Sequence, residues 1–356
     1  MKSIFLYNIQ LLRGIAVLLV VLFHIMSVER KYGGKSYLLS NITNFGMIGV
    51  DIFFVISGFI MVVVTQRYSK NIKKAFEFLY NRIARIYPTY WFYTLLVLIV
   101  YLIKPTMVNS SQGNRVDILA SFLLLPSDVL PLVMVGWTLI YEMFFYIIFF
   151  LMLLFLPQKH LFKALISWIG FIIFLNLTFN YNNPYFRLIS DPLTIEFILG
   201  SIMAICFYKV NKKVSNIFLI VVVIFSFVIS IFIYYNYFLS KGVIFISGWD
   251  RVAVFGVPSV CIVFAFVLLE RNGISINFII TKIGDASYSI YLSHLLTLNV
   301  IGRIWSKFST NSIWDNYIML PILLISSIIV GMFSYKYIEK PLISYAKKIK
   351  ICMHSK

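Results

Sequence analysis

Charged residues are scarce in this chain, and acidic residues are especially scarce. Asp, Glu, Lys and Arg make up 12% of the 356 residues, and only 13 residues are Asp or Glu. Soluble domains carry roughly 25% charged residues, so this composition excludes an ordinary soluble protein. The surplus of Lys and Arg gives a formal net charge of +18. In so apolar a chain we interpret that surplus as a topology signal rather than as a nucleic-acid-binding surface, and we expect no nucleic acid partner.

Cysteine is also scarce. The three cysteines, Cys206, Cys261 and Cys352, are scattered along the chain. Their spacing excludes a disulfide framework and a cysteine-based metal site, and we predict no metal cofactor. The first apolar segment carries Arg13 and lacks a small-residue cleavage site, so we expect it to remain as a membrane span rather than to be removed as a signal peptide.

Long apolar runs are what the sequence has in abundance. Hydrophobic residues make up 61% of the chain, and the repeated runs are close to 20 residues long. They predict an all-α integral membrane protein, a polytopic bundle of about ten transmembrane helices in a lipid bilayer. We expect one transmembrane domain over residues 1–341 and a basic cytoplasmic tail over residues 342–356. The ten predicted spans are 5–27, 44–65, 86–103, 137–156, 161–179, 188–208, 214–237, 251–269, 283–302 and 315–336.

The distribution of basic residues predicts the orientation. If the N-terminus is inside, 20 of the 31 Lys and Arg residues fall in inner segments and 10 in outer segments, while Arg13 lies within the membrane. This two-to-one bias places both termini in the cytoplasm. The longest outer connection, 105–135, contains the apolar piece ILASFLLLP, which is too short to span and predicts a re-entrant or interfacial helix.

Two ionisable residues, Arg13 and His24, lie in the first predicted span. Ionisable groups within a membrane are costly and usually functional. Eleven steps of about 100° put both side chains on one helical face, about 16 Å apart along the axis. Arginine stays cationic whereas histidine exchanges protons near neutral pH. The pair is therefore suited to holding an anion at one depth and moving a proton at another.

Two carboxylates are predicted to lie in the membrane. Asp51, in GVDIFFVISGFIM, has a depth similar to that of His24 and is expected either to orient that ring or to bond to backbone at a helix start. Glu142, in GWTLIYEMFFY, lies just inside an outer boundary. It is expected to be a catalytic or ion-binding group, or else to form a structural salt bridge with Arg13 or another arginine.

A basic segment precedes the third predicted span. Arg82 and Arg85, in RIARIYPTYW, are three residues apart and share a helical face at the cytoplasmic boundary. Paired arginines suit bidentate binding of phosphate, and Lys73 and Lys74 add positive charge nearby. The alternative interpretation is a positive-inside anchor with no ligand.

The ninth predicted span contains KIGDASYSIYLSHLL. Its spacings of three place Tyr288, Tyr291 and His294 on one face, where His294 either lines the same cavity as His24 or is a structural histidine.

In this order, the motifs resemble the acyltransferase-3 family of bacterial membrane proteins, from residue 8 to residue 341. The first span differs from the usual DGLRG run by reading IQLLRG, and the glutamate segment reads WTLIYE where relatives usually read WSLxxE. The matching pieces are Arg13 with His24, GVDIFFVISGF at 49–59, RIARIYPTYW at 82–91, Trp137 with Glu142, SYSIYLSH at 287–294, and Glu339 with Pro341.

The resemblance implies an enzyme that transfers acyl groups, usually acetyl from acetyl-CoA, to hydroxyls of carbohydrates. The acceptors in the family are commonly envelope polysaccharides or their lipid-linked precursors, and the location would be the bacterial cytoplasmic (inner) membrane, within a polysaccharide-synthesis complex. By this resemblance, the pair of His24 and Arg13 is essential. The resemblance also makes Arg82 and Arg85 candidates for binding the CoA phosphates. From the arrangement of the residues themselves we predict catalytic roles for Asp51 and Glu142 and a contribution of Lys73 and Lys74 to CoA binding. We also predict acceptor binding by Trp137, Tyr291 and His294.

In the expected reaction, His24 acts as the general base that deprotonates a sugar hydroxyl, or it forms a covalent acyl-histidine. Two other classes of function stay open at this point: a non-enzymatic carrier or flippase for a polysaccharide intermediate, and a structural partner in a synthesis complex. Release of free thiol that depends on the acceptor distinguishes the enzyme from the carrier or flippase. The structural-partner interpretation predicts instead that His24→Ala leaves function intact.

Overall fold

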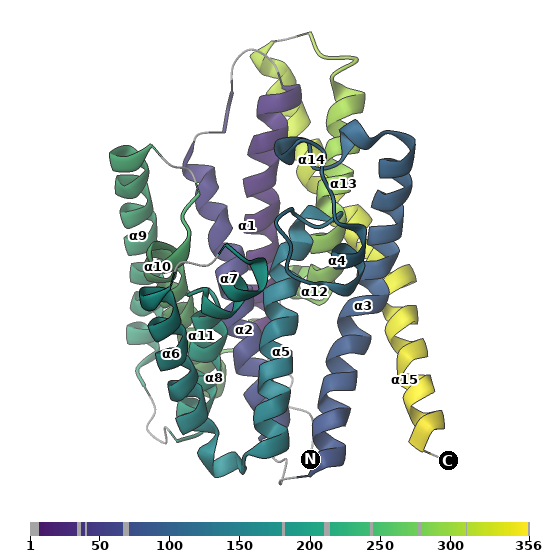
Figure 1. Ribbon diagram of the computed structural model, residues 1–356. Coiled ribbons are helices and arrows are strands. Elements are labelled where there is room, and N and C mark those ends of the chain that lie inside the picture. Colours follow the sequence, from purple (N-terminus) through teal and green to yellow (C-terminus); the bar gives the residue numbers. More distant parts are fainter. Residues whose placement is uncertain are drawn as a thin grey trace.

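The computed structural model describes residues 7–33, 37–39, 41–66, 71–179, 182–209, 214–242, 245–276, 279–310 and 312–354. All the regular elements in these ranges are helices, as predicted. The longer ones stand side by side in an upright bundle (Figure 1). The helices are α1 Tyr7–Tyr32, α2 Ile48–Thr65, α3 Ile72–Ile103, α4 Ile118–Leu123, α5 Trp137–Phe155, α6 Leu161–Thr178, α7 Pro184–Ser190, α8 Thr194–Lys209, α9 Asn216–Lys241, α10 Gly248–Arg251, α11 Val257–Arg271, α12 Ile279–Asp285, α13 Ser287–Trp305, α14 Ile313–Ser334 and α15 Lys340–His354. Short 3₁₀ or π-helical turns are η1 Asn41–Met47, η2 Pro105–Met107, η3 Ser110–Gln112, η4 Met134–Gly136, η5 Gln158–His160, η6 Val252–Gly256 and η7 Tyr335–Glu339.

Nine helical segments in the described part of the chain are long and apolar enough to cross a membrane. They correspond to nine of the ten predicted spans. The remaining predicted span, 283–302, corresponds to α12 and α13. Helix α13 is more polar because it carries serines and His294 on buried positions, which are covered by α1 and α14 rather than exposed to lipid.

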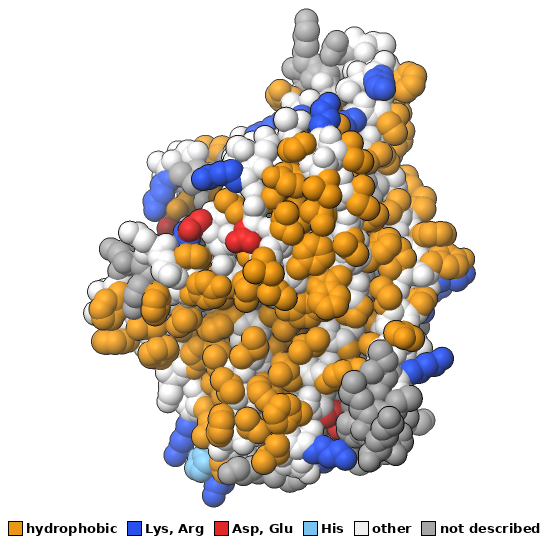
Figure 2. All heavy atoms as spheres, turned by 45° about the vertical axis from the view of Figure 1, so that its right-hand side comes forward, with side chains coloured by type: hydrophobic (Ala, Val, Ile, Leu, Met, Phe, Trp, Pro, Cys, Tyr) orange, Lys and Arg blue, Asp and Glu red, His pale blue; other side chains and the backbone are white. Residues whose placement is uncertain are grey.

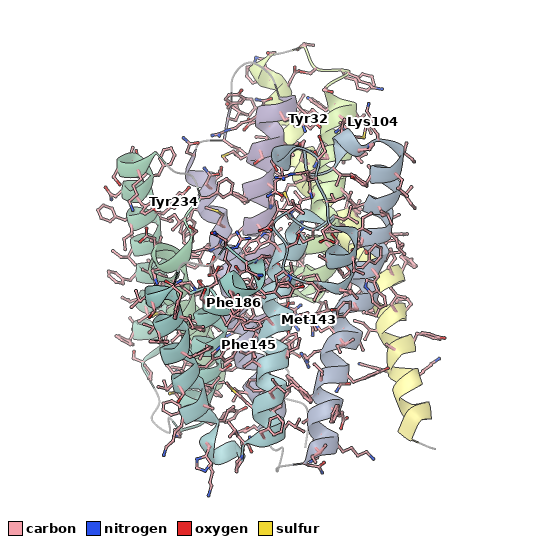
Figure 3. The ribbon with its side chains drawn as sticks, in the orientation of Figure 1. Tyr32, Lys104, Met143, Phe145, Phe186 and Tyr234 are labelled. Atoms are coloured by element: carbon pink, nitrogen blue, oxygen red, sulfur yellow. The ribbon has the colours of Figure 1, made fainter. Side chains whose placement is uncertain are left out.

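Successive long helices run in alternating directions. Tyr32 at the end of α1 and Lys104 just after α3 lie toward the same end of the bundle (Figure 3), and α15 extends toward the opposite end (Figure 1). Counting α13, ten long helices of alternating direction lie between the start of α1 and the start of α15.

The outer surface of the bundle is apolar around its middle. Figure 2 shows a broad band of hydrophobic side chains, with most of the Lys and Arg side chains on this face toward the two ends of the molecule. Leu177, Ile217 and Phe232 are among the large apolar residues that the described part of the chain exposes. An apolar band of this kind fits the hydrocarbon layer of a bilayer, and we conclude that the protein is a membrane protein.

Small residues allow α2 and α8 to cross at close range. A Cβ atom on Gly58 would overlap the backbone of Phe197, and one on Gly200 would overlap the backbone of Val55. The hydroxyl of Ser201 donates to the carbonyl of Gly58 at 3.0 Å. Gly58 and Gly200 thus serve helix packing, and the crossing fixes α2 against the core of the bundle.

The structure extends two of the predicted elements, the third span and the tail. Helix α3 begins at Ile72, well before the predicted start at 86, and continues through Pro88. The predicted interfacial helix is present as the short α4. The predicted tail is helical to His354, as α15, and packs on α3, where the hydroxyl of Tyr80 donates to the carbonyl of Ala346 at 2.7 Å.

Candidate active site

A cavity of about 200 Å³ lies among five helices, α1, α2, α3, α5 and α13. A single water needs roughly 10–15 Å³ by this measure, so the cavity has room for part of a large ligand. Apolar residues form most of the wall, and a small number of charged and hydroxyl groups project from it. The polar lining residues are Gln10, Arg13, Ser57, Arg82, Arg85, Thr138, Glu142, Tyr146, Ser287, Tyr288 and Tyr291.

Three guanidinium groups line this cavity. Arg82 and Arg85 come from one face of α3, as their spacing predicted, and Arg13 comes from α1. The Nη1 atom of Arg13 donates to Oε1 of Gln10, one turn earlier, at 3.1 Å. Gln10 therefore gives Arg13 the local support that the altered IQLLRG run left undetermined.

Arg82 has unused donor capacity. Its guanidinium carbon lies 5.8 Å from the ring centre of Phe78 and 6.0 Å from that of Tyr146, both within cation–π range. Its Nε atom is buried and has no hydrogen-bond partner among the described residues. A buried donor without a partner is costly, so this position favours a ligand that supplies an acceptor.

Glu142 is held by hydroxyl groups. Ser57 donates to its Oε1 at 2.9 Å, and the hydroxyl of Tyr146 donates to the same oxygen. Arg13 and Glu142 line the same cavity but form no ion pair with each other in the described part of the chain. The alternative expectation of a structural salt bridge between them is therefore wrong, and one carboxylate oxygen of Glu142 is free of these hydroxyl bonds.

A second carboxylate, that of Glu339, interacts with two of the arginines. Glu339 is buried and accepts a hydrogen bond from Ser289 Oγ at 2.6 Å. It interacts electrostatically with Arg13 and Arg85. Glu339 therefore reduces the mutual repulsion of the two cations.

The two membrane histidines meet beside this cavity. The ring centres of His24 on α1 and His294 on α13 are 5.1 Å apart, and that of Tyr291 is 5.9 Å from His294. The cavity lining includes Tyr291 but neither histidine. The hydroxyl of Tyr291 pairs with that of Thr138 at 2.8 Å, and Tyr291 thus stands between the cavity and the histidines.

The predicted pairing of Asp51 with His24 is wrong. Both oxygens of Asp51 accept from Arg251, at 2.9 Å from Nε and 3.0 Å from Nη2, and both side chains are buried. Glu196 lies beside this ion pair, and its two buried oxygens have no hydrogen-bond partner among the described residues. The rotation of α2 turns Asp51 toward α10 rather than toward α1, which sequence spacing alone does not determine.

Three other predicted residues lie outside the cavity lining. Trp137 lies beneath Arg251, with the guanidinium carbon 5.6 Å from its ring centre. Lys73 and Lys74 lie in the first turn of α3, about two turns before Arg82. These lysines are not part of the cavity wall.

Some residues that line or neighbour the cavity were not predicted from the sequence. Ser57, whose hydroxyl donates to Glu142, and Tyr146, one turn after Glu142, were not among the predicted site residues. The i, i+4 spacing was the available signal for Tyr146, and the i, i+3 spacing was the signal for Gln10. Arg251 had no such signal, because its partner is 200 residues away.

The described residues contain no group of three or more His, Cys, Asp or Glu side chains that could hold a metal ion.

The sequence matches the acyltransferase domain family over residues 6–336. It is also 26% identical, over 319 residues, to the exopolysaccharide production protein ExoZ of Rhizobium meliloti (strain 1021), covering 84% of this chain and 90% of that protein. No solved structure matches the chain significantly.

Proposed function

This chain belongs to the acyltransferase family, as an enzyme that transfers acyl groups, and we propose that it moves an acetyl group from acetyl-CoA to a hydroxyl of a polysaccharide. The acceptor would be an exopolysaccharide or its lipid-linked precursor. This part of the proposal is supported by the name of the relative ExoZ, which describes a protein of exopolysaccharide production.

The observation that carries the choice of donor is the set of three arginines on one mostly apolar cavity. CoA combines phosphates with a long, weakly polar arm ending in a thioester. Arginine forks bind phosphate in a bidentate manner, which makes Arg82 and Arg85 suited to the phosphates. The apolar wall formed by residues such as Phe53 and Ile60 suits the arm, and Lys73 and Lys74 would attract the anion to the entrance.

The chemistry is proposed for the Tyr291 end of the cavity, beside the histidines. His24 takes the proton of the sugar hydroxyl while the oxygen attacks the thioester carbonyl, and the C–S bond then breaks. The proton passes from His24 to the departing thiolate, which leaves as free CoA. Arg13 or Glu142, in the cavity, would orient the donor. In the covalent variant of the mechanism, His24 carries the acetyl group between the two steps.

The proposed location is the bacterial cytoplasmic membrane with both termini in the cytoplasm. CoA is a cytoplasmic metabolite, and the basic entrance formed by the start of α3 lies on the inner side in this orientation. The enzyme would work with the polysaccharide-synthesis machinery that supplies the acceptor.

The test is release of free CoA thiol from acetyl-CoA by purified protein in proteoliposomes, with and without polysaccharide acceptor. We expect acceptor-dependent release, and we expect His24→Gln to lower it by about 10²-fold or more because a proton-transfer group is lost. His160→Gln, at an exposed turn, is the matched control and should keep wild-type turnover. A wild-type protein that moves polysaccharide without releasing thiol would instead be the carrier or flippase.

A further inference from the structure

The His294 ring is held in one tautomer by its own helix. It is fully buried, and its Nδ1 atom lies 2.7 Å from the carbonyl oxygen of Tyr291 and 3.2 Å from that of Ile290. A carbonyl oxygen only accepts hydrogen bonds, so Nδ1 must carry the proton. In the neutral ring the lone pair then lies on Nε2, and a buried ring without a counter-ion favours the neutral form.

The Nε2 atom of His294 can accept a hydrogen bond. It is buried and has no hydrogen-bond partner among the described residues. The neighbouring titratable ring is that of His24, whose centre is 5.1 Å away. A ring nitrogen lies about 1.1 Å from its ring centre, so edge-on rings at this separation bring two nitrogens to about 2.9 Å, an ordinary N–H hydrogen-bond length. The planes of the two rings are tilted by 46° to each other. The half-buried His24 ring must therefore rotate to form this hydrogen bond.

We propose that His294 is the positioning residue of the acyl-transfer reaction, whose Nε2 accepts a hydrogen bond from His24 when His24 holds the hydroxyl proton. This inference rests on the proposed function. The role corresponds to that of the aspartate in a serine-protease triad, which fixes and stabilises a protonated histidine. Here a neutral imidazole takes that role, and no atoms are exchanged between the two rings.

The neighbouring carboxylates form hydrogen bonds with groups other than His24. Asp51 is bound to Arg251 through both oxygens. Glu29, five residues beyond His24 on α1, accepts from the backbone of Leu38 and Leu39 and from Asn316. The titratable ring in contact with that of His24 is His294, and the hydroxyl of Tyr291, the other titratable neighbour of His294, is bonded to Thr138.

Three substitutions at one position separate the proposed role from simple packing. His294→Gln places an amide oxygen near the former Nε2, whereas His294→Asn keeps only a group near the former Nδ1, and His294→Phe keeps a ring with no acceptor. We expect the Asn and Phe variants to lose about 10²-fold in kcat with an unchanged KM for acetyl-CoA, since orientation at the reacting group is lost while the donor site is intact. The Gln variant should recover much of that loss.

The control is Thr297→Val, one turn along α13, which removes a buried hydroxyl that bonds to the carbonyl of Ser293. It should show wild-type kcat. Equal losses in the Gln, Asn and Phe variants, or a wild-type kcat in His294→Phe, would overturn the inference while leaving the acyltransferase intact. Absence of acceptor-dependent thiol release from the wild-type protein would instead overturn the proposed function on which the inference rests.

Discussion

At the scale of single residues, the arginines of the cavity differ from the many other basic residues of the chain. On the face shown in Figure 2, most Lys and Arg side chains lie toward the ends of the bundle, where we predict that they set the orientation. Arg82 and Arg85 instead line a cavity that also contains Arg13. Three like charges in one cavity repel one another, and Glu339 offsets this only in part. A polyanionic ligand would remove the remaining repulsion.

We therefore predict that replacing both Arg82 and Arg85 by Ala raises the Kd for CoA by about 10²-fold, because two charge-assisted hydrogen bonds are lost. The remaining affinity should also depend less on salt. Isothermal titration in detergent at two ionic strengths measures both effects. The double variant Lys159→Ala with Lys163→Ala removes two exposed cations outside the cavity and should bind CoA like the parent. Parent-like binding by the Arg82 and Arg85 variant would make these arginines topology anchors.

Helical geometry determined which residues of the site could be predicted at this scale. The shared face of Arg82 and Arg85 follows from their spacing alone, and the structure confirms it. The surroundings of Asp51 do not follow from spacing, because its partner Arg251 is brought to it by the tertiary fold. The same limit applies to the contact between His24 and His294, which lie on helices far apart in sequence.

At the scale of helices, the buried ion pair of Asp51 and Arg251 connects α2 to α10 in the interior of the bundle. Removing one member of a buried pair leaves an uncompensated charge, which typically costs 3–5 kcal/mol. The pair also stands directly before the π-helical turn η6, so it fixes the entry to α11.

We predict that Asp51→Leu lowers the melting temperature in detergent markedly, and that the double variant with Arg251→Met recovers much of the loss because no unpaired charge remains. The comparison is Asp128→Asn, which breaks the exposed pair of Asp128 with Arg187 and should change stability by no more than about 1 kcal/mol. Similar melting temperatures for Asp51→Leu and Asp128→Asn would contradict a stabilising role for the buried pair.

The limits of the helices were predictable where apolar runs define them. The predicted third span began at 86 because the preceding segment is basic, whereas α3 begins at Ile72, where Asn71 caps the helix by accepting from the backbone of Lys74. A polar extension beyond the bilayer leaves no hydropathy signal. Helix α13 was predicted as a span despite its polarity. The structure shows that its serines are buried against other helices and do not face lipid.

At the scale of the whole molecule, ten alternating crossings and an apolar outer band agree with the arrangement expected from hydropathy and basic residues. The orientation relative to the membrane stays a prediction. In a background without native cysteines, Ser110→Cys, in η3 beyond the end of α3, should react with an impermeant thiol reagent added outside intact cells. Lys74→Cys, at the start of α3, should react only after the membrane is opened. The reverse pattern would invert the topology and place the basic entrance on the outer side.

The closed end of the cavity has a consequence for the energy supply of the cell. A passage wide enough for a nucleotide and a sugar together, if it ran uninterrupted from one face to the other, would also conduct protons and dissipate the gradient that drives ATP synthesis. Tyr291, bonded through its hydroxyl to Thr138 and to the carbonyl of Val135, ends this cavity before the two histidines. Under the proposed function, Tyr291 would let the donor and the acceptor approach one point without a continuous passage between the two faces of the bilayer.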